Sequence, residues 1–305
     1  MQVHYNIEQL PVFKKAIITI GTFDGVHKGH QKIIDAMKKE SKKNNGDTVI
    51  ITFHPHPRKI IEENTPLELI NTLDEKINLL ENLGINHLVV VPFTEAFATQ
   101  TAEEYIENFL INKFHPEIII IGYDHHFGKD RKGNFQLLQA QSVKYNYRLI
   151  EIPKQLLQEI AISSTKIRNA IKNGEVETIN NLLGYSFFFE GIVMQGDQLG
   201  RKLGYPTANL SYTDEDKIHL GEGVYAAEVM VKNENKKGML SIGTRPTLDD
   251  TMERIEINIF DFDDNIYGQK LKVTVKKYLR NQIKFNSLQN LKDQMLLDKQ
   301  DALQV

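Results

Sequence analysis

The spacing of apolar residues divides the chain into two parts with different periodicity. Up to about residue 183, short apolar runs alternate with helical patterns, and the continuously apolar run at 118–121 is typical of a strand buried on both faces of a parallel sheet. Helical patterns separate the predicted strands, which are 16–20, 48–53, 87–91, 118–121 and 148–152. This part is therefore predicted to be a doubly wound, Rossmann-like α/β domain.

Several of the predicted helices have recognisable ends. Thr72 with Glu75 and Thr101 with Glu104 form capping-box patterns ahead of apolar helical faces. A helix follows the first strand, and the remaining helical segments are predicted at 135–145, from Ser164 to about Gly174, and immediately before Gly184.

After residue 186 the pattern changes to β-rich segments separated by turns. The expected strands are 187–194, 224–231, 239–242, 254–260 and 271–278, and the last helical pattern carries Leu288, Leu291, Met295 and Leu296. A small antiparallel β-barrel with a terminal helix fits this order. We place the division so that the domains are 1–184 and 185–305.

Composition narrows the classes of function. A chain of 305 residues suits two domains. Its net charge of −3 provides no broad basic field for nucleic acid or an anionic membrane. The absence of cysteine excludes disulfides, cysteine-ligated zinc and a thiol nucleophile. With no apolar run near the ~20 residues of a spanning helix and no signal-peptide pattern, we expect a cytoplasmic protein that acts on small molecules.

The first candidate site is GTFDGVHKGH at residues 21–30, between the first strand and the first helix. Ligands of α/β sheets bind at the carboxyl ends of strands, and a helix start offers free N–H groups to phosphate. Gly21, Gly25 and Gly29 let the backbone approach a ligand closely. His27 and His30 project from one helical face and suit hydrogen bonds to a triphosphate. A glycine-rich turn with two surface histidines is the structural alternative, and a histidine metal site is a weaker one because no third ligand is near.

Two further segments have phosphate-binding character. Ser164 and Thr165 open a predicted helix, and Arg168 follows one turn later with donors suited to phosphate oxygens. In the β-rich part, GRKLGYPTAN at 200–209 follows the first strand, and no Walker A sequence is present. Its threonine and asparagine oxygens suit Mg²⁺ and nucleotide phosphate. An ordinary helix cap and a proline turn are the respective alternatives.

These motifs resemble, in order and over nearly the whole chain, those of the prokaryotic bifunctional riboflavin kinase/FAD synthetase family. Residues 52–58 look like the family's TFxPHPR loop, 122–128 like its flavin-binding segment, 162–168 like its ISSTxIR motif and 206–209 like its PTAN motif. The resemblance implies an enzyme that phosphorylates riboflavin to FMN with ATP and Mg²⁺. It then adenylylates FMN to FAD with a second ATP and releases pyrophosphate.

The resemblance also implies roles for individual residues. Glu256 would be the base of the kinase step, and His27 and His30 would act in adenylylation. The flavin would contact Pro55, Asp124, Phe127 and Arg280, and Thr207 and Asn209 would hold the metal ion. ATP and its phosphates would contact Gly21, Phe23, Asp24, Gly29, Ser164, Thr165, Arg168, Gly200, Arg201, Gly204, Pro206, Thr207 and Asn209.

Some features leave alternatives open. His125, His126, Asn258 and Gln282 differ from the family's usual residues, so their roles are undetermined. The expected partners are riboflavin, FMN, FAD and ATP, without nucleic acid or membrane, and self-association is open. The alternatives in function are a single activity with the other domain as a flavin-binding regulator, a non-catalytic FMN or FAD sensor, and transfer from another nucleotide such as CTP.

Overall fold

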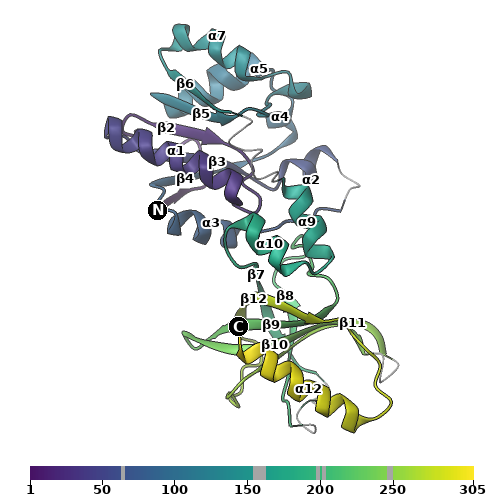
Figure 1. Cartoon of the computed structure of the whole chain (residues 1–305). Coiled ribbons are helices and arrows are strands. Elements are labelled where there is room, and N and C mark those ends of the chain that lie inside the picture. Colours follow the sequence, from purple (N-terminus) through teal and green to yellow (C-terminus); the bar gives the residue numbers. More distant parts are fainter. Residues whose placement is uncertain (63–65, 154–162, 197–199, 201–203, 246–249) are drawn as a thin grey trace. The chain divides into compact units, whose positions relative to one another are not determined.

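The computed structural model describes residues 1–305 except 63–65, 154–162, 197–199, 201–203 and 246–249 (Figure 1). The chain forms two compact units. The first contains Met1–Leu67 and Asn71–Ser163, and the second contains Glu68–Ile70 and Ser164–Val305.

The first unit is built on a six-stranded parallel sheet with the order β1-β4-β3-β2-β5-β6. Its strands are β1 (Gln2–His4), β2 (Ile17–Ile20), β3 (Thr48–His54), β4 (His87–Pro92), β5 (Ile118–Gly122) and β6 (Arg148–Ile152). The five predicted strands are confirmed, and β1 was not predicted. Strand order runs outward from β2 through β3 to β4, then restarts on the other side with β5 and β6. Such a switch point opens a crevice at the carboxyl ends of β2 and β5, where ligands bind.

Helices cover both faces of this sheet (Figure 1). Successive strand residues point to opposite faces, so Ile17 packs against Ile34 and Met37, whereas Ile18 packs in the cluster of Tyr105 and Phe109. Burial on both faces explains why the strands are continuously apolar. The helical elements are α1 (Lys28–Asn44), α2 (Pro57–Ile61), α3 (Leu73–Asn82), α4 (Glu95–Ala98), α5 (Ala102–Glu104), η1 (Tyr105–Ile111), α6 (Asn112–Phe114), η2 (Lys129–Arg131) and α7 (Phe135–Tyr145).

Both predicted capping boxes are present. The Thr72 hydroxyl accepts a hydrogen bond from the Glu75 amide at 3.3 Å, and the Glu75 carboxylate accepts one from the Thr72 amide at 3.0 Å. Thr101 and Glu104 form the same reciprocal pair. Beyond Glu104 the helix takes a π form, η1, which the sequence pattern did not predict. Its predicted apolar face is nevertheless buried.

The second unit contains a closed barrel with the strand order β10-β11-β8-β7-β12-β9, and all its neighbours are antiparallel. Its strands are β7 (Phe188–Met194), β8 (Ala208–Tyr212), β9 (Gly223–Val231), β10 (Glu234–Arg245), β11 (Asp250–Ile259) and β12 (Lys270–Arg280). The predicted barrel is confirmed. The sequence pattern missed β8, because glycine and proline crowd the residues that precede it.

Helices α9 (Ser164–Lys172) and α10 (Val176–Leu183) group with the barrel by their contacts. The Asn180 side chain accepts a hydrogen bond from the Phe187 amide at 2.8 Å and donates to the Val275 carbonyl at 3.3 Å. The compact second unit therefore begins at Ser164, whereas the sequence pattern placed the division at 184–185. The functional boundary stays a prediction.

The terminal helix α12 (Leu288–Leu303) covers an apolar patch on the barrel. Met295 and Ala302 pack in one cluster with Phe260 and with residues of β9 and β10. Two other leucines of the helix are largely exposed, Leu296 at 49% and Leu297 at 53%. Among the described residues, no helix is both long and apolar enough to cross a membrane.

Candidate functional site

The loop after β2 carries the first candidate site at the predicted switch point. The Gly21 amide still donates to the Ile51 carbonyl at 3.0 Å, so the loop leaves the sheet immediately after this residue. Phe23 and Val26 have φ angles of 49° and 36°, and Gly25 has 87°. Three left-handed residues in so short a segment turn the chain sharply into α1. Strain at non-glycine residues is common where a site must be held in one shape.

His27 and His30 are brought together at the start of α1. His27 is the N-cap, and its Nδ1 accepts a hydrogen bond from the His30 amide at 3.4 Å. The two rings stack with centroids 3.7 Å apart and an interplanar angle of 15°. Burial, then the neighbouring His27, then Lys76 hold the pKa of His30 well below its usual value. At neutral pH His30 is therefore uncharged, which removes like-charge repulsion within the pair.

The loops after β3 and β5 carry the predicted flavin contacts. Pro55 follows β3, joined to His54 by a cis peptide bond. Asp124 is exposed in the turn after β5. Phe127 is 6% exposed and stacks on Tyr105 with ring centroids 5.0 Å apart, so it belongs to the core beneath this turn. Next to it, burial lowers the pKa of His125 to about 4, so this imidazole is neutral at pH 7. The flavin contacts stay predictions.

Ser164, Thr165 and Arg168 lie on the first two turns of α9, in the second compact unit. Arg168 donates from Nε to the Glu68 carbonyl at 2.6 Å, which ties the helix to the short segment Glu68–Ile70. We predict that the serine and threonine hydroxyls bind the same triphosphate as the histidine pair, and this prediction is untested.

In the barrel unit, tight backbone contacts hold the described part of the GRKLGYPTAN loop. A Cβ added to Gly200 would lie 2.3 Å from the Tyr205 carbonyl oxygen, and the Tyr205 amide donates to Gly200 at 2.9 Å. Asn258 is 5% exposed and donates from Nδ2 to the Pro206 carbonyl at 2.6 Å. The residue that departs from the family pattern thus joins β11 to the loop. The Arg201 assignment lies outside the described residues.

Glu256 lies directly between two polar neighbours in the barrel wall. Its partner across β11 and β8 is Asn209, and its partner across β11 and β10 is Ser241. Side chains of directly opposite residues share one face of a sheet. The structure therefore brings the predicted base and the predicted metal ligand together, although nothing in the sequence pattern indicated that they are paired.

Gln282 joins the candidate site through a contact that the sequence pattern did not predict. Its Nε2 donates to the Ser241 hydroxyl at 2.8 Å and to the Ile242 carbonyl at 3.2 Å. A glutamate, the usual family residue, has no N–H to give to a carbonyl oxygen. The departure from the family pattern at Gln282 was the signal in the sequence that could have pointed to this contact.

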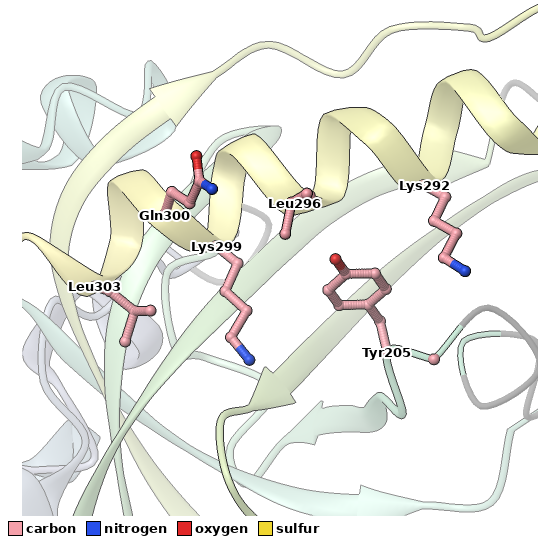
Figure 2. Close-up of a pocket in the computed structure, with 7 residues that line it drawn as sticks. Tyr205, Lys292, Leu296, Lys299, Gln300 and Leu303 are labelled. Atoms are coloured by element: carbon pink, nitrogen blue, oxygen red, sulfur yellow. The ribbon is translucent and has the colours of Figure 1, made fainter.

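Two hollows border the same loop. One of ≈ 520 Å³ is lined by Asn209, Tyr212, His219 and Arg254 together with neighbouring residues. Another of ≈ 370 Å³ lies between Gly204–Tyr205 and the terminal helix, where Lys292, Leu296 and Lys299 line it (Figure 2). Both give the loop open space for a ligand, with Arg254 or the two lysines as cationic neighbours.

Arg280 has a structural partner that the sequence did not predict. Its Nε donates to both oxygens of Asp298 at 2.9 and 3.0 Å, and its Nη2 donates at 2.7 Å. Asp298 is 3% exposed on α12. This bidentate pair anchors the terminal helix to the end of β12, and the flavin contact predicted for Arg280 is untested.

The residues at the loop fit a hard metal ion. Thr207 and Asn209 offer a hydroxyl and an amide oxygen, and the Glu256 carboxylate belongs to the strand paired with Asn209. A Cβ added to Gly196 would lie 1.9 Å from the Asn209 amide nitrogen, so the glycine leaves the Asn209 side chain its room. Among the described residues, no cluster of three or more histidine, aspartate or glutamate side chains forms a separate metal site.

Comparisons with known proteins find two family models, one in each part of the chain. A family model described as FAD synthetase matches residues 10–166, and one described as riboflavin kinase matches residues 183–305. Three relatives called bifunctional riboflavin kinase/FMN adenylyltransferase come from Buchnera aphidicola, Bacillus subtilis and Escherichia coli K12. They are 38%, 36% and 32% identical, over 92%, 95% and 98% of this chain and 91%, 92% and 95% of their own.

A solved structure agrees over the same length. A protein from Streptococcus pneumoniae, described as a macrolide-efflux protein, is 31% identical and has a TM-score of 0.87. The match covers 98% of this chain and 97% of that one. Both units therefore have counterparts in one solved chain.

Proposed function

Because this chain belongs to the family of bifunctional riboflavin kinases/FMN adenylyltransferases, we propose that the barrel unit uses Glu256 for phosphoryl transfer and that the α/β unit uses His27 and His30 for adenylyl transfer. The family's two reactions convert riboflavin to FMN and FMN to FAD at the expense of ATP. The observation that carries the assignment is the direct pairing of Asn209 with Glu256 across β8 and β11.

In the kinase step, the Glu256 carboxylate accepts the proton of the riboflavin 5′-hydroxyl. The hydroxyl oxygen then bonds to the γ-phosphorus of ATP, the bond to the β-phosphate oxygen breaks, and ADP leaves. Asn209 and Ser241 flank the carboxylate on the two neighbouring strands and restrict its position. Such positioning is a large part of phosphoryl-transfer catalysis.

Thr207 and Asn209 are the residues that would hold Mg²⁺, which supplies charge neutralisation to the phosphates when bound. Asn258 would help to position Thr207, because its hydrogen bond to the Pro206 carbonyl holds the residue before Thr207 in place.

In the adenylyl step, an oxygen of the FMN phosphate bonds to the α-phosphorus of a second ATP and pyrophosphate leaves. No proton need be removed from a phosphate dianion, so a base is not required. His27 and His30 lie at the start of α1, where hydrogen-bond donors can meet developing negative charge. Ser164, Thr165 and Arg168 supply further candidate phosphate contacts.

The test follows both products in time. The purified chain is incubated with riboflavin, Mg²⁺ and ATP, and the flavins are separated by chromatography. FMN should appear first and FAD second, and supplied FMN should yield FAD directly. If only FMN forms, the chain is a kinase whose other domain acts as a flavin-binding regulator. If riboflavin is not converted at all, the chain is a non-catalytic flavin sensor. The same incubation with CTP in place of ATP tests whether another nucleotide can serve as the donor.

We propose the division of activities at residues 184–185, and the contacts of α10 sharpen its test. Asn180 on this helix bonds to both the Phe187 amide and the Val275 carbonyl. A fragment starting at Ser164 keeps these bonds and a fragment starting at Tyr185 loses them. Riboflavin phosphorylation by both fragments would place the division at 184–185; activity of the longer one alone would place it earlier. The cytoplasmic location and self-association stay predictions.

A further inference from the structure

A three-residue strap, Glu68–Ile70, belongs to the second compact unit although it comes from the first half of the sequence. The family model described as FAD synthetase covers these positions, since it matches residues 10–166. Leu69 is 9% exposed and Ile70 is completely buried. Buried backbone groups need hydrogen-bond partners, so the partners of the strap show which part of the molecule it serves.

Leu69 pairs with the segment 216–218 in the manner of a parallel strand. Its amide donates to the Asp216 carbonyl at 2.7 Å, and its carbonyl accepts from the Ile218 amide at 2.9 Å. These two bonds lie on either side of Lys217, the residue that bridges to Leu69. The strap therefore holds the segment 216–218 through its backbone.

Two cationic side chains of the second unit bond to the other strap carbonyls. Arg168 donates from Nε to the Glu68 carbonyl at 2.6 Å, and Lys217 donates from Nζ to the Ile70 carbonyl at 2.7 Å. Lys217 is only 3% exposed and also donates to the Phe188 carbonyl on β7 at 3.1 Å. Lysine is rarely buried unless it is paired, and hydrogen bonds from a charged donor are stronger than neutral ones. All three carbonyls of the strap are thus bonded within the second unit.

The segment held by the strap continues into the wall of the hollow of ≈ 520 Å³. Glu215 and His219, on the two sides of 216–218, both line this hollow. The His219 ring stacks on the Tyr212 ring, with centroids 4.3 Å apart and an interplanar angle of 16°. Asn209 lines the same hollow. The position of the strap therefore bears on the space beside the predicted metal ligand.

We propose that the strap is a positioning segment of the kinase site, which holds 216–218 and thereby keeps His219 and the wall of the hollow in one place for a substrate. The proposal rests on the proposed location of phosphoryl transfer at Asn209 and Glu256. The strap acts through the segment 216–218 and does not touch the substrate.

The expected effect of the strap is on substrate binding more than on turnover. A wall that is ordered before the substrate arrives costs no ordering entropy during binding, whereas a loose wall must be ordered at that moment. Asn209 and Glu256 are paired across β8 and β11, so the barrel itself holds these groups. Loss of one bond of the strap should therefore raise a KM of the kinase reaction by about 3- to 10-fold and change kcat less.

The first test compares Leu69→Pro with Leu69→Ala in the full protein. Both variants lose the leucine side chain, but only proline lacks the N–H that bonds to Asp216. The KM values for riboflavin and for ATP are measured in riboflavin phosphorylation. One of them should be about 3- to 10-fold higher in Leu69→Pro than in Leu69→Ala. Equal KM values in the two variants would overturn the proposal, and so would a loss confined to FAD formation from supplied FMN.

The second test removes the bond to Ile70 from the opposite side of the contact. Lys217→Met keeps a side chain of similar length without the ammonium, and it should raise the same KM. Lys236→Met, which removes a lysine from a surface pair with Glu234 at 2.9 Å, should leave that KM unchanged. Equal KM values in these two variants would overturn the proposal. If Lys217→Met does not fold, the Leu69 variants decide.

The third test measures amide hydrogen exchange by mass spectrometry, without substrate, in the Leu69 variants. Exchange in peptides that span 214–220 should be faster in Leu69→Pro than in Leu69→Ala, while β9, β10 and β12 stay protected. No difference would overturn the proposal. An equal rise in those strands would also overturn it, since the strap would then stabilise the whole barrel. Because exchange needs no turnover, this result is independent of the proposed function, which fails if the wild-type chain forms no FMN.

Discussion

Replacement of Arg280 by methionine should loosen the terminal helix from the barrel. Arg280 donates three hydrogen bonds of 2.7 to 3.0 Å to Asp298, a carboxylate that is 3% exposed. In Arg280→Met, Asp298 keeps the hydrogen bond from Gln294 at 2.9 Å but loses its counter-charge. Breaking a buried pair by removal of one partner costs about 3–5 kcal/mol, because the remaining charge is uncompensated.

This cost is large enough to measure in urea. The free energy of unfolding falls by about 1–3 kcal/mol for each molar unit of urea, so a loss of 3–5 kcal/mol moves the midpoint of this unit down by roughly 2 M. The chain contains no tryptophan, so the transition is followed by far-UV circular dichroism. An Arg280→Met midpoint equal to that of the wild type would refute the reasoning, since it would mean that the pair contributes nothing.

A paired variant distinguishes this structural role from the predicted flavin contact. Arg280→Met/Asp298→Leu removes both charges and leaves an apolar pair, which is commonly neutral or stabilising. Its urea midpoint should return to the wild-type value or exceed it. If Arg280 also contacts riboflavin, the KM for riboflavin will remain raised in this stable variant; a wild-type KM would show that Arg280 only anchors α12.

Three further outcomes follow from the sites. Glu256→Gln should lower riboflavin phosphorylation by roughly 10²–10⁴-fold, the usual contribution of a general base, and leave FAD formation from FMN intact; full kinase activity would make Glu256 an ordinary strand residue. His30→Ala should lower FAD formation by about 10²–10³-fold with normal FMN formation, and a normal FAD rate would make the histidine structural. Gly200→Ala should impair the kinase alone, because the alanine Cβ would lie 2.3 Å from the Tyr205 carbonyl oxygen. Steady-state rates of both half-reactions check this, and an unaffected kinase would show that the loop can shift freely.

Much of the architecture was determined locally and could be predicted. The isoleucines of β5 indicated a strand buried on both faces, and reciprocal pairs such as Thr72 with Glu75 marked helix starts, because capping bonds involve only residues close in sequence. The positive φ angles of Lys232 and Asn233 likewise agree with the turn predicted between two β-rich segments. Periodicity and turn chemistry act over a few residues, so the sequence contains them directly.

Other elements were missed for the same physical reason. The β8 strand has only five residues after a glycine- and proline-rich loop, and its hydrogen bonds go to β7 and β11 rather than to its own neighbours in the chain. The π form of η1 changes the hydrogen-bond register but not the apolar face that packs on the sheet, so the spacing of Tyr105 and Phe109 did not reveal it.

For the sites, the order of residues along the chain showed which residue types were present and which strand ends they followed. The three-dimensional packing was needed to show that Asn209 faces Glu256, that Gln282 donates to Ser241, and that the Asp24 carboxylate accepts a hydrogen bond from the Asn71 amide. Each of these pairings joins residues distant in the chain. Barrel register and the packing of α3 bring them together, because both are set by burial of apolar side chains over the whole unit rather than by any local pattern.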